Sequence, residues 1–258
     1  MKLRGLIYNF GLKLVYPVLY LGKWDTGFIS YNVTNNAKFK LRVNTSDKLI
    51  LLEVWKTKTY IDQDFDIKKN DVVVDVGANI GAFSVLAAKK AFDGKIYAYE
   101  PDKENCDMLK KNNALNDLHN VFVLNLAVTG KRGYIDFFAS KLNDGGHSIY
   151  GIDSRKATKV KSTTLSDIFK INNLKKINYL KIDAEGAEYD ILLNTPAEII
   201  RKVDKIVLEY HDYLNYDHDH KDLKEYLEGN GFKVKMDKNF LIRKIFSVGL
   251  IKACRENF

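Results

Sequence analysis

Short apolar runs alternate with amphipathic segments through the middle of the chain. The runs are rich in β-branched residues, as expected of strands that are buried in a sheet. They span residues 72–76, 95–99, 121–124, 177–183 and 205–209. The segments between and after them predict helices at residues 82–88, 102–115, 163–169, 189–194 and around 223–227. This alternation predicts an α/β fold, with a doubly wound, mostly parallel sheet and helices on both faces.

Two more regions of the chain have strand patterns. Residues 133–138 alternate between apolar and polar positions, which predicts an extra strand. Residues 232–236 and 248–253 are short apolar segments near the end of the chain, and we expect them to pair as a hairpin.

The first seventy residues have a different pattern and are predicted to form a small extension. Apolar residues recur at helical spacing from Leu3 to Leu14, with basic residues between them, and Pro17 should end that helix. A strand is predicted at 38–43 and a helix at 49–60. We distinguish an extension, residues 1–70, from a main domain, residues 71–258. Because no Gly/Ser/Pro linker separates them, we expect the extension to pack on the main domain.

The basic amphipathic stretch within residues 1–20 has two interpretations. In the favoured interpretation, its apolar face docks on the main domain or on a second subunit of a homo-oligomer. The alternative is a peripheral contact with a membrane surface. The stretch is too short and too charged to span a bilayer, and no cleavage site of a signal peptide follows it.

Composition narrows the class of protein less than the pattern does. The chain has 258 residues, 46% of them hydrophobic, and only two cysteines without metal-ligand spacing. We therefore expect a cytoplasmic protein without a disulfide framework. The net charge of +8 permits a nucleic acid, an anionic membrane or an acidic glycan as partner. The lysines are spread along the chain and no basic-aromatic RNA-binding motif is present, so a nucleic-acid partner is disfavoured.

The turn after the first core strand is the first candidate ligand site. It carries Asp75, Gly77, Asn79 and Gly81, where a strand passes through glycines into a helix. The spacing is not the G-x-G-x-x-G of dinucleotide enzymes, and no Lys-Ser or Lys-Thr follows as in a P-loop. An acid at the head of the turn suits a positively charged ligand without phosphate, such as S-adenosylmethionine. An ordinary strand-to-helix turn is the alternative.

Acids stand at the carboxyl ends of several predicted strands. Glu100 ends the second core strand, nineteen positions after Gly81, where such acids accept hydrogen bonds from ribose hydroxyls. Asp183 and Glu209 end the fourth and fifth strands. Because open parallel sheets bind ligands at this edge, the coincidence predicts a single site there.

At these motifs the chain resembles the FkbM family of S-adenosylmethionine-dependent methyltransferases. The resemblance lies in Val73-Val-Asp-Val-Gly-Ala-Asn-Ile-Gly81, Tyr99-Glu-Pro101 and Leu180-Lys-Ile-Asp-Ala-Glu-Gly-Ala-Glu188, and it covers roughly residues 70–215. It implies a class I, Rossmann-like methyltransferase fold with seven strands, the last antiparallel. It also implies methyl transfer to a hydroxyl oxygen, often on a sugar or a secondary metabolite.

The resemblance also implies roles for single residues. The methionine end of S-adenosylmethionine would be held by Asp75, Gly77, Asn79 and Gly81, and the ribose by Glu100. The adenine would be bordered by Asn125 and Ala127. Asp183 would lie beside the sulfonium and the incoming hydroxyl.

A hydroxyl acceptor needs a base near the methyl donor. The candidates are Asp183, Glu185 and His211, and the sequence does not choose between Asp183 and His211 as the group that takes the proton. Acids in the first turn of a helix also stabilise its exposed amides, which is the structural alternative for Glu185 and Glu188. A hydrogen-bonded strand end is the alternative for His211.

A run rich in aspartate and histidine follows the fifth strand. It consists of His211, Asp212, Asp217, His218, Asp219 and His220. These residue types bind divalent metals, but a solvated loop leading into a helix explains the same residues and is the favoured interpretation, so we assign no metal ligand. Two other functions remain as alternatives: a nucleic-acid methyltransferase and a binding protein that has lost activity on this fold.

Overall fold

The computed structural model describes residues 27–34, 37–43, 45–138, 157–214, 217–236 and 248–255. The helix predicted within residues 1–20 lies outside these ranges, together with the membrane or subunit contact considered for it. Within the described ranges, no helix combines the length and the apolar character that crossing a lipid bilayer requires.

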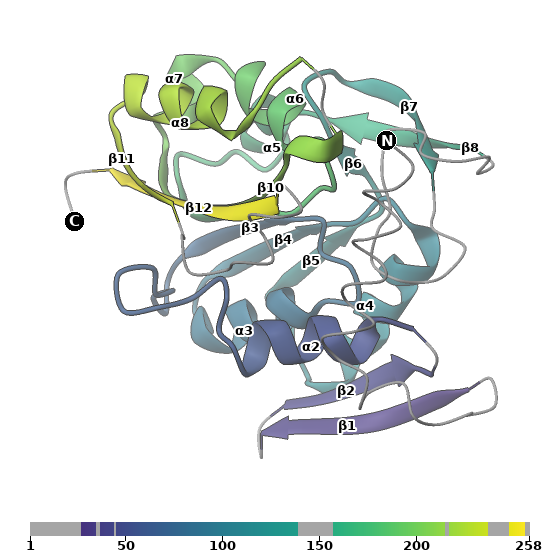
Figure 1. The fold of residues 1–258 in the computed structure, drawn as a ribbon. Helices are drawn as coiled ribbons and strands as arrows, with labels where there is room; N and C mark the ends of the chain where they lie inside the picture. The colour runs from purple at the N-terminus through teal and green to yellow at the C-terminus, as the bar shows by residue number, and fades with distance from the viewer. Residues whose placement is uncertain are drawn as a thin grey trace.

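A seven-stranded sheet forms the centre of the molecule and confirms the predicted fold class (Figure 1). Its strands lie in the order β11 (Phe232–Met236), β12 (Val248–Arg255), β10 (Val203–His211), β9 (Ile177–Ile182), β3 (Val72–Val76), β4 (Lys95–Tyr99) and β5 (Val121–Leu124). The pairs from β10 to β5 are parallel. β12, the last strand in the chain, is antiparallel to both of its neighbours. The predicted terminal hairpin is therefore formed by β11 and β12.

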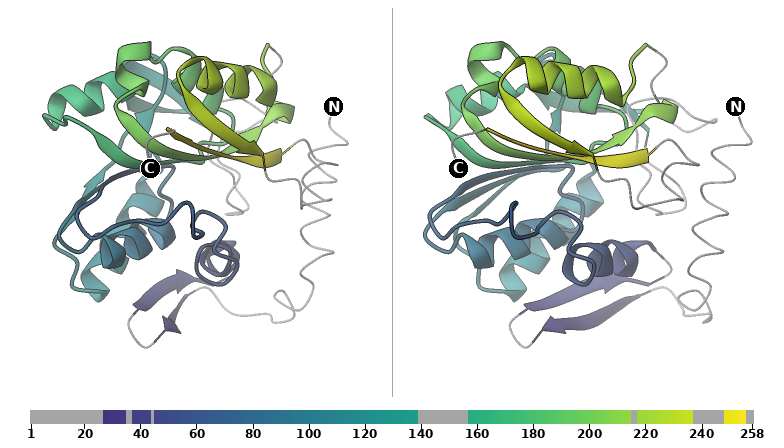
Figure 2. Two further views of the ribbon diagram at one scale, coloured as in Figure 1. Left: turned by 90° about the vertical axis from the view of Figure 1, so that its left-hand side faces the viewer. Right: turned by 60° about the vertical axis from the view of Figure 1, so that its left-hand side comes forward.

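Helices cover both faces of this sheet, which gives three layers (Figure 2). One face carries α3 (Ala82–Lys90) and α4 (Lys103–Leu115); the other carries α5 (Leu165–Ile171), α6 (Glu188–Leu193), α7 (Ala197–Ile200) and α8 (His220–Gly229). Neighbouring residues of β9 point to opposite cores. Tyr179 belongs to the cluster with α3, and Leu180 to the cluster with α6 and α8. Burial on both faces explains why the core strands are continuous apolar runs.

The N-terminal described segment packs on the α3 side of the sheet. It consists of a hairpin, β1 (Phe28–Thr34) and β2 (Ala37–Arg42), and helix α2 (Asp47–Trp55). β2 confirms the strand predicted at 38–43, whereas β1 lacked a recognisable pattern. α2 ends at Trp55 and not at Tyr60 as predicted, because the hydroxyls of Thr57 and Thr59 donate to the carbonyl of Glu53 and Lys58 is left-handed.

A small second sheet lies beside the carboxyl edge of the central one. Its strands are β6 (Ala127–Val128), β8 (Ala157–Thr163) and β7 (Gly133–Phe138), of which the last was predicted. The predicted helix start at Thr163 is wrong, since this residue ends β8 and the Thr164 side chain caps α5. β10 also runs two residues further than predicted, because Tyr210 and His211 pair with β12.

Candidate active site

The glycine turn after β3 has the sharp backbone geometry that its sequence predicted. Gly77, Asn79 and Gly81 all have positive φ, at 73°, 49° and 87°. A Cβ on Gly77 would lie 1.8 Å from the carbonyl oxygen of Asp183. Glycine is therefore required at position 77 because the ends of β3 and β9 approach each other closely. At Gly81 a Cβ would meet the Leu109 side chain at 2.9 Å.

Asp75 is fully buried and is held by protein groups behind this turn. Ser84 donates a hydrogen bond of 2.6 Å to Oδ2, and Lys181 Nζ lies 3.3 Å from Oδ1, an ion pair without an aligned hydrogen bond. Lys181 Nζ also donates to the carbonyl of Gly77 at 2.8 Å. Asp75 therefore supports the turn from within, through a buried lysine that sequence reasoning did not select.

Lys181 links two of the predicted site carboxylates. Its Nζ lies 3.3 Å from Asp75 and 3.7 Å from Asp183. Burial alone would lower the pKa of Lys181, but these two carboxylates outweigh it and hold the pKa above the ordinary lysine value. The lysine therefore keeps its charge inside the protein. Lys181 lies within the Lys-Ile-Asp motif, and this motif is the sequence feature that could have identified it as a site residue.

Glu100 lies directly across from the turn and faces it. Its Oε2 accepts a 2.7 Å hydrogen bond from the Asn79 amide, and its Oε1 accepts one of 2.8 Å from the Asp102 amide. Each oxygen retains a further lone pair for a ligand hydroxyl. Burial of the side chain raises the pKa of Glu100 to about 7 despite these amides.

The two residues predicted to border the adenine lie after β5 and differ in exposure. Asn125 is exposed, and its side-chain amide donates to the carbonyl of Glu100 at 2.9 Å, so it holds the end of β4 in place. Ala127 is 3% exposed and pairs with Ser162 in the small sheet. Their contact with a cofactor stays a prediction.

Asp183 follows β9 and is reached by a residue from far away in the chain. The Tyr60 hydroxyl donates to Asp183 Oδ2 at 2.9 Å and lies 3.3 Å from Glu209 Oε2. Burial and the two carboxylates raise the pKa of Tyr60 well above its ordinary value, so it remains a donor. Nothing in the sequence around Tyr60 marked it as a site residue. The Asp183 side chain is 26% exposed and so is open on one side.

His211, at the end of β10, lies between two glutamates. Its Nδ1 is 3.1 Å from Glu188 Oε1 and its Nε2 is 3.5 Å from Glu185 Oε2. Burial would lower the pKa of His211, but the two carboxylates outweigh it and hold that pKa well above the usual range. Burial raises the pKa of Glu185 above its usual value, and its backbone is left-handed with φ of 49°. The structure therefore brings the three predicted catalytic residues, Asp183, Glu185 and His211, to one edge of the sheet.

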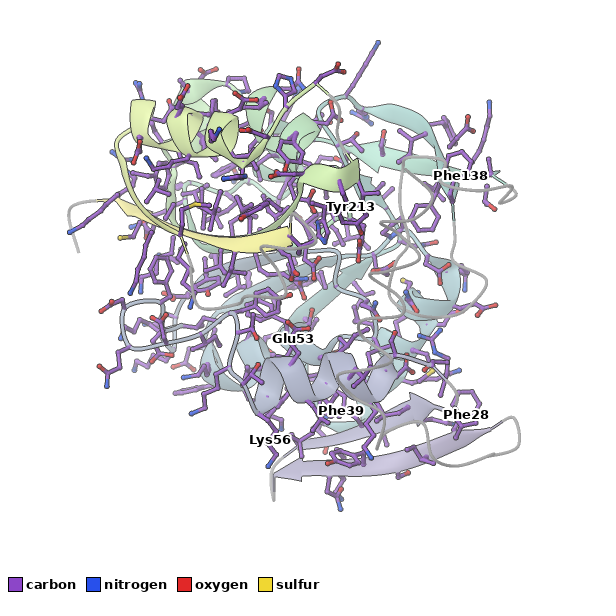
Figure 3. The ribbon with its side chains drawn as sticks, viewed as in Figure 1. Phe28, Phe39, Glu53, Lys56, Phe138 and Tyr213 are labelled. Carbon is purple, nitrogen blue, oxygen red and sulfur yellow. The ribbon has the colours of Figure 1, made fainter. Side chains whose placement is uncertain are left out.

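Glu188 does more than stabilise the start of α6. Its two oxygens accept hydrogen bonds from the amides of Ala184 and Gly186, at 2.9 and 2.8 Å, as the structural alternative expected. The same carboxylate also contacts His211, which the sequence did not indicate. Ligand atoms of Asp183, Glu188 and His211 all lie within 4.8 Å of one another, which is close enough to hold a metal ion. Figure 3 shows Tyr213, in the turn Asp212–Leu214 after β10, beside this edge of the sheet.

The Asp/His-rich run is not a single cluster in the structure. Asp212 contacts the Tyr189 hydroxyl and His220 Nδ1, the latter at 2.6 Å. Asp219 caps α8 in a capping box, and His218 pairs with Asp222 on the exposed surface. His211 lies beside Glu185 and Glu188, whereas Asp219 caps a helix and His218 forms a surface pair.

The fold and the site together define a class of enzyme. The protein has a seven-stranded sheet with its last strand reversed, a glycine turn after β3 and a buried acid after β4. These three features together are typical of class I S-adenosylmethionine-dependent methyltransferases. The donor set fits the cofactor, since Glu100 has free lone pairs for ribose hydroxyls and Asp183 is an open carboxylate for a sulfonium. The class of enzyme confirms the predicted cofactor, and the roles of single residues toward it stay predictions.

Comparison with known proteins identifies the family within this class. The model of the methyltransferase FkbM domain matches residues 75–234, and the chain belongs to this methyltransferase family. Methyltransferase 1 of Beauveria bassiana is 25% identical over 223 residues, which are 78% of this chain and 88% of that protein. The hexuronic acid methyltransferase AglP of Haloferax volcanii is 24% identical over 57% of this chain and 58% of its own length.

A solved structure supports the fold. The FkbM methyltransferase from Methylobacillus flagellatus superposes with a TM-score of 0.52 at 16% sequence identity. The match covers 76% of this chain and 47% of that one, so the present chain spans about half of that protein.

Proposed function

We propose that this methyltransferase is an O-methyltransferase that acts on a hydroxyl of a sugar, a glycan or a polyhydroxylated secondary metabolite. The observation that carries the proposal is the open carboxylate of Asp183, which Tyr60 and Lys181 orient at the edge where the cofactor's methionine end is expected. The name of AglP, a hexuronic acid methyltransferase, adds support for a sugar acceptor.

The proposed reaction is an in-line displacement. When bound, S-adenosylmethionine supplies a methyl carbon that is activated by a positive sulfur. The acceptor hydroxyl would supply the oxygen that takes this methyl group, S-adenosylhomocysteine would leave, and Asp183 would take the hydroxyl proton. We assign the base to Asp183 because it is open, whereas His211 is 2% exposed and enclosed by two glutamates. Holding the two reactants in line supplies much of the rate acceleration.

A nucleic-acid acceptor is less compatible with this site. Asp183 and Glu185 are the partly exposed acids at the acceptor side, and carboxylates repel a phosphate backbone. An inactive binding protein is the other alternative, which would bind the cofactor without turnover.

The proposal is tested in two steps. Calorimetric titration with S-adenosylmethionine should show binding to wild type and loss of binding in Glu100→Ala. Transfer of labelled methyl to a panel of sugars, uronic acids and RNA should then give a base-stable methyl ether on a sugar, with kcat reduced about 100-fold or more in Asp183→Asn. Transfer only to RNA, or cofactor binding without turnover on any acceptor, would contradict it.

A further inference from the structure

Asp183, Glu188 and His211 come from three segments that converge at the carboxyl edge of the sheet. Asp183 follows β9, Glu188 begins α6 and His211 ends β10. Their ligand atoms all lie within 4.8 Å of one another. From this geometry we propose that the three side chains bind a divalent transition-metal cation beside the acceptor hydroxyl.

The donors are fixed in place before any cation arrives. Both oxygens of Glu188 accept backbone amide hydrogen bonds within the turn from Ala184 to Gly186. The His211 ring turns Nδ1 toward Glu188, and Glu185 Oε2 lies 3.5 Å from Nε2 on the far side. A carboxylate behind the ring of a ligating histidine orients that ring and makes it a better ligand.

Exposure changes across the cluster in the way that a substrate-binding metal site requires. The side chains of Glu188 and His211 are 0% and 2% exposed, whereas that of Asp183 is 26% exposed. The protein therefore closes the site on one side and leaves the other open. An open position is what separates catalytic from structural metal sites.

The donor types select the kind of cation. Two carboxylates and one imidazole suit Mn²⁺, Fe²⁺ or Zn²⁺, whereas Mg²⁺ prefers oxygen ligands alone. The imidazole among the donors therefore points to a first-row transition metal.

The catalytic role of this cation rests on the proposed function. The cation would hold the acceptor oxygen and lower the pKa of its hydroxyl, and the proton would pass to the Asp183 oxygen that does not bind the cation. It would also let an acceptor with its own carboxylate, such as a uronic acid, approach an edge that Asp183, Glu185 and Glu188 make acidic.

The test uses the chelator-treated 258-residue chain titrated with Mn²⁺, followed by calorimetry and by electron paramagnetic resonance. Wild type should show one saturable site. Asp183→Asn and His211→Gln should each weaken it at least tenfold, and Glu185→Gln should weaken it about tenfold. The matched control, Asp217→Asn with Glu225→Gln, removes surface acids near α8 and should leave both the Mn²⁺ affinity and methyl transfer unchanged. Circular dichroism of each variant checks its fold. Asp183→Asn should disturb the fold least, because the Asp183 side chain is partly exposed.

Three results would overturn the metal site. These are no saturable Mn²⁺ binding by folded wild type, equal affinity in wild type, Asp183→Asn and His211→Gln, or loss of binding in the surface control. The first two would leave Glu188 and His211 as a buried ion pair. Titration of the same samples with S-adenosylmethionine keeps the two proposals apart. Cofactor binding and O-methyl transfer without a Mn²⁺ site overturn the metal alone, whereas Mn²⁺ binding without transfer to any hydroxyl overturns the proposed function.

Discussion

Gly77 shows how one missing side chain shapes the site. Its left-handed backbone and the Asp183 carbonyl both exclude a Cβ, so the glycine allows the first and fourth core strands to bring their ends together. The glycine turn follows the end of β3, and Asp183 follows the end of β9. The glycine is therefore a requirement of protein packing as well as of turn geometry.

We expect Gly77→Ala to destabilise the protein and to weaken cofactor binding. A left-handed φ costs a non-glycine residue about 1–2 kcal/mol, and the contact with Asp183 adds to this, so the free energy of unfolding should fall by at least about 2 kcal/mol. Urea unfolding measures the loss. Gly229→Ala is the control, since Gly229 ends α8 with open space around it. Similar unfolding curves for the two variants would contradict the role given to Gly77.

Glu100 predicts a pH dependence of cofactor binding. Its pKa is raised to about 7, so the carboxylate is protonated below that pH and loses acceptor capacity for ribose hydroxyls. The affinity for S-adenosylmethionine should fall by up to about tenfold for each pH unit below about 7. Because the folded pKa is raised, the sign for stability is the opposite: ionisation of Glu100 destabilises the ligand-free protein as the pH rises from about 4.5 to about 7.

Calorimetry between about pH 6 and about pH 8 measures this dependence. Glu100→Gln is the control, because it keeps the size of the side chain and cannot ionise. The variant should bind weakly at every pH, with a flatter profile. A profile as steep as that of wild type would assign the titration to another group.

At the scale of elements, the loop after α2 carries Tyr60 onto two strand ends. The Tyr60 ring packs edge-on against Phe83 and lies 5.3 Å from Lys181 Nζ, while its hydroxyl meets Asp183 and Glu209. A segment that precedes the family domain thus completes the predicted active site.

Tyr60→Phe should therefore lower kcat about tenfold while the affinity for S-adenosylmethionine changes little. The substitution keeps the ring contacts and removes only the donor that orients Asp183. Loss of a buried hydrogen bond to a charged group should also lower the free energy of unfolding by about 1–3 kcal/mol. Steady-state kinetics and urea unfolding measure the two effects. Tyr226→Phe is the matched control, since its hydroxyl contacts the Thr195 carbonyl away from the site. An equal fall of kcat in both variants would argue against positioning by Tyr60.

At the scale of the whole molecule, the described segment before residue 70 shares a buried core with the central sheet. Phe39, Leu41 and Leu51 belong to the same buried cluster as Phe83 of α3 and Tyr179 of β9. Phe39 is fully buried and packs edge-on against Trp55. The N-terminal segment is thus expected to fold and unfold with the sheet.

Phe39→Ala should destabilise the entire molecule by about 3–5 kcal/mol. In denaturant, wild type should show one transition, with far-UV circular dichroism and tryptophan fluorescence coinciding, and the variant should keep one transition at a lower midpoint. Phe92→Ala is the control, because Phe92 is 63% exposed and should matter little. A separate early transition of the fluorescence in the variant would show that the extension folds by itself.

The sequence by itself determined the layered α/β architecture, because apolar periodicity sets strands and helices and parallel strands bring their carboxyl ends to one edge. Its short motifs, through the resemblance to FkbM methyltransferases, implied the reversed last strand, the family and the cofactor. The rule about parallel strands predicted that Asp75, Glu100, Asp183 and Glu209 would meet. The sequence failed where tertiary pairing overrides a local pattern, as at Thr163 and at the end of α2.

Only the tertiary structure decided which side chains touch at that edge. Tyr60 reaches Asp183 across 123 positions and Glu209 across 149, and no local pattern encodes contacts at such separations. Folding also split the Asp/His-rich run, because β10 pairs through His211 and inserts that ring between Glu185 and Glu188 while the rest of the run caps and flanks α8. The chemistry of the site thus depends on close packing between distant segments, whereas the class of enzyme follows from patterns within short ones.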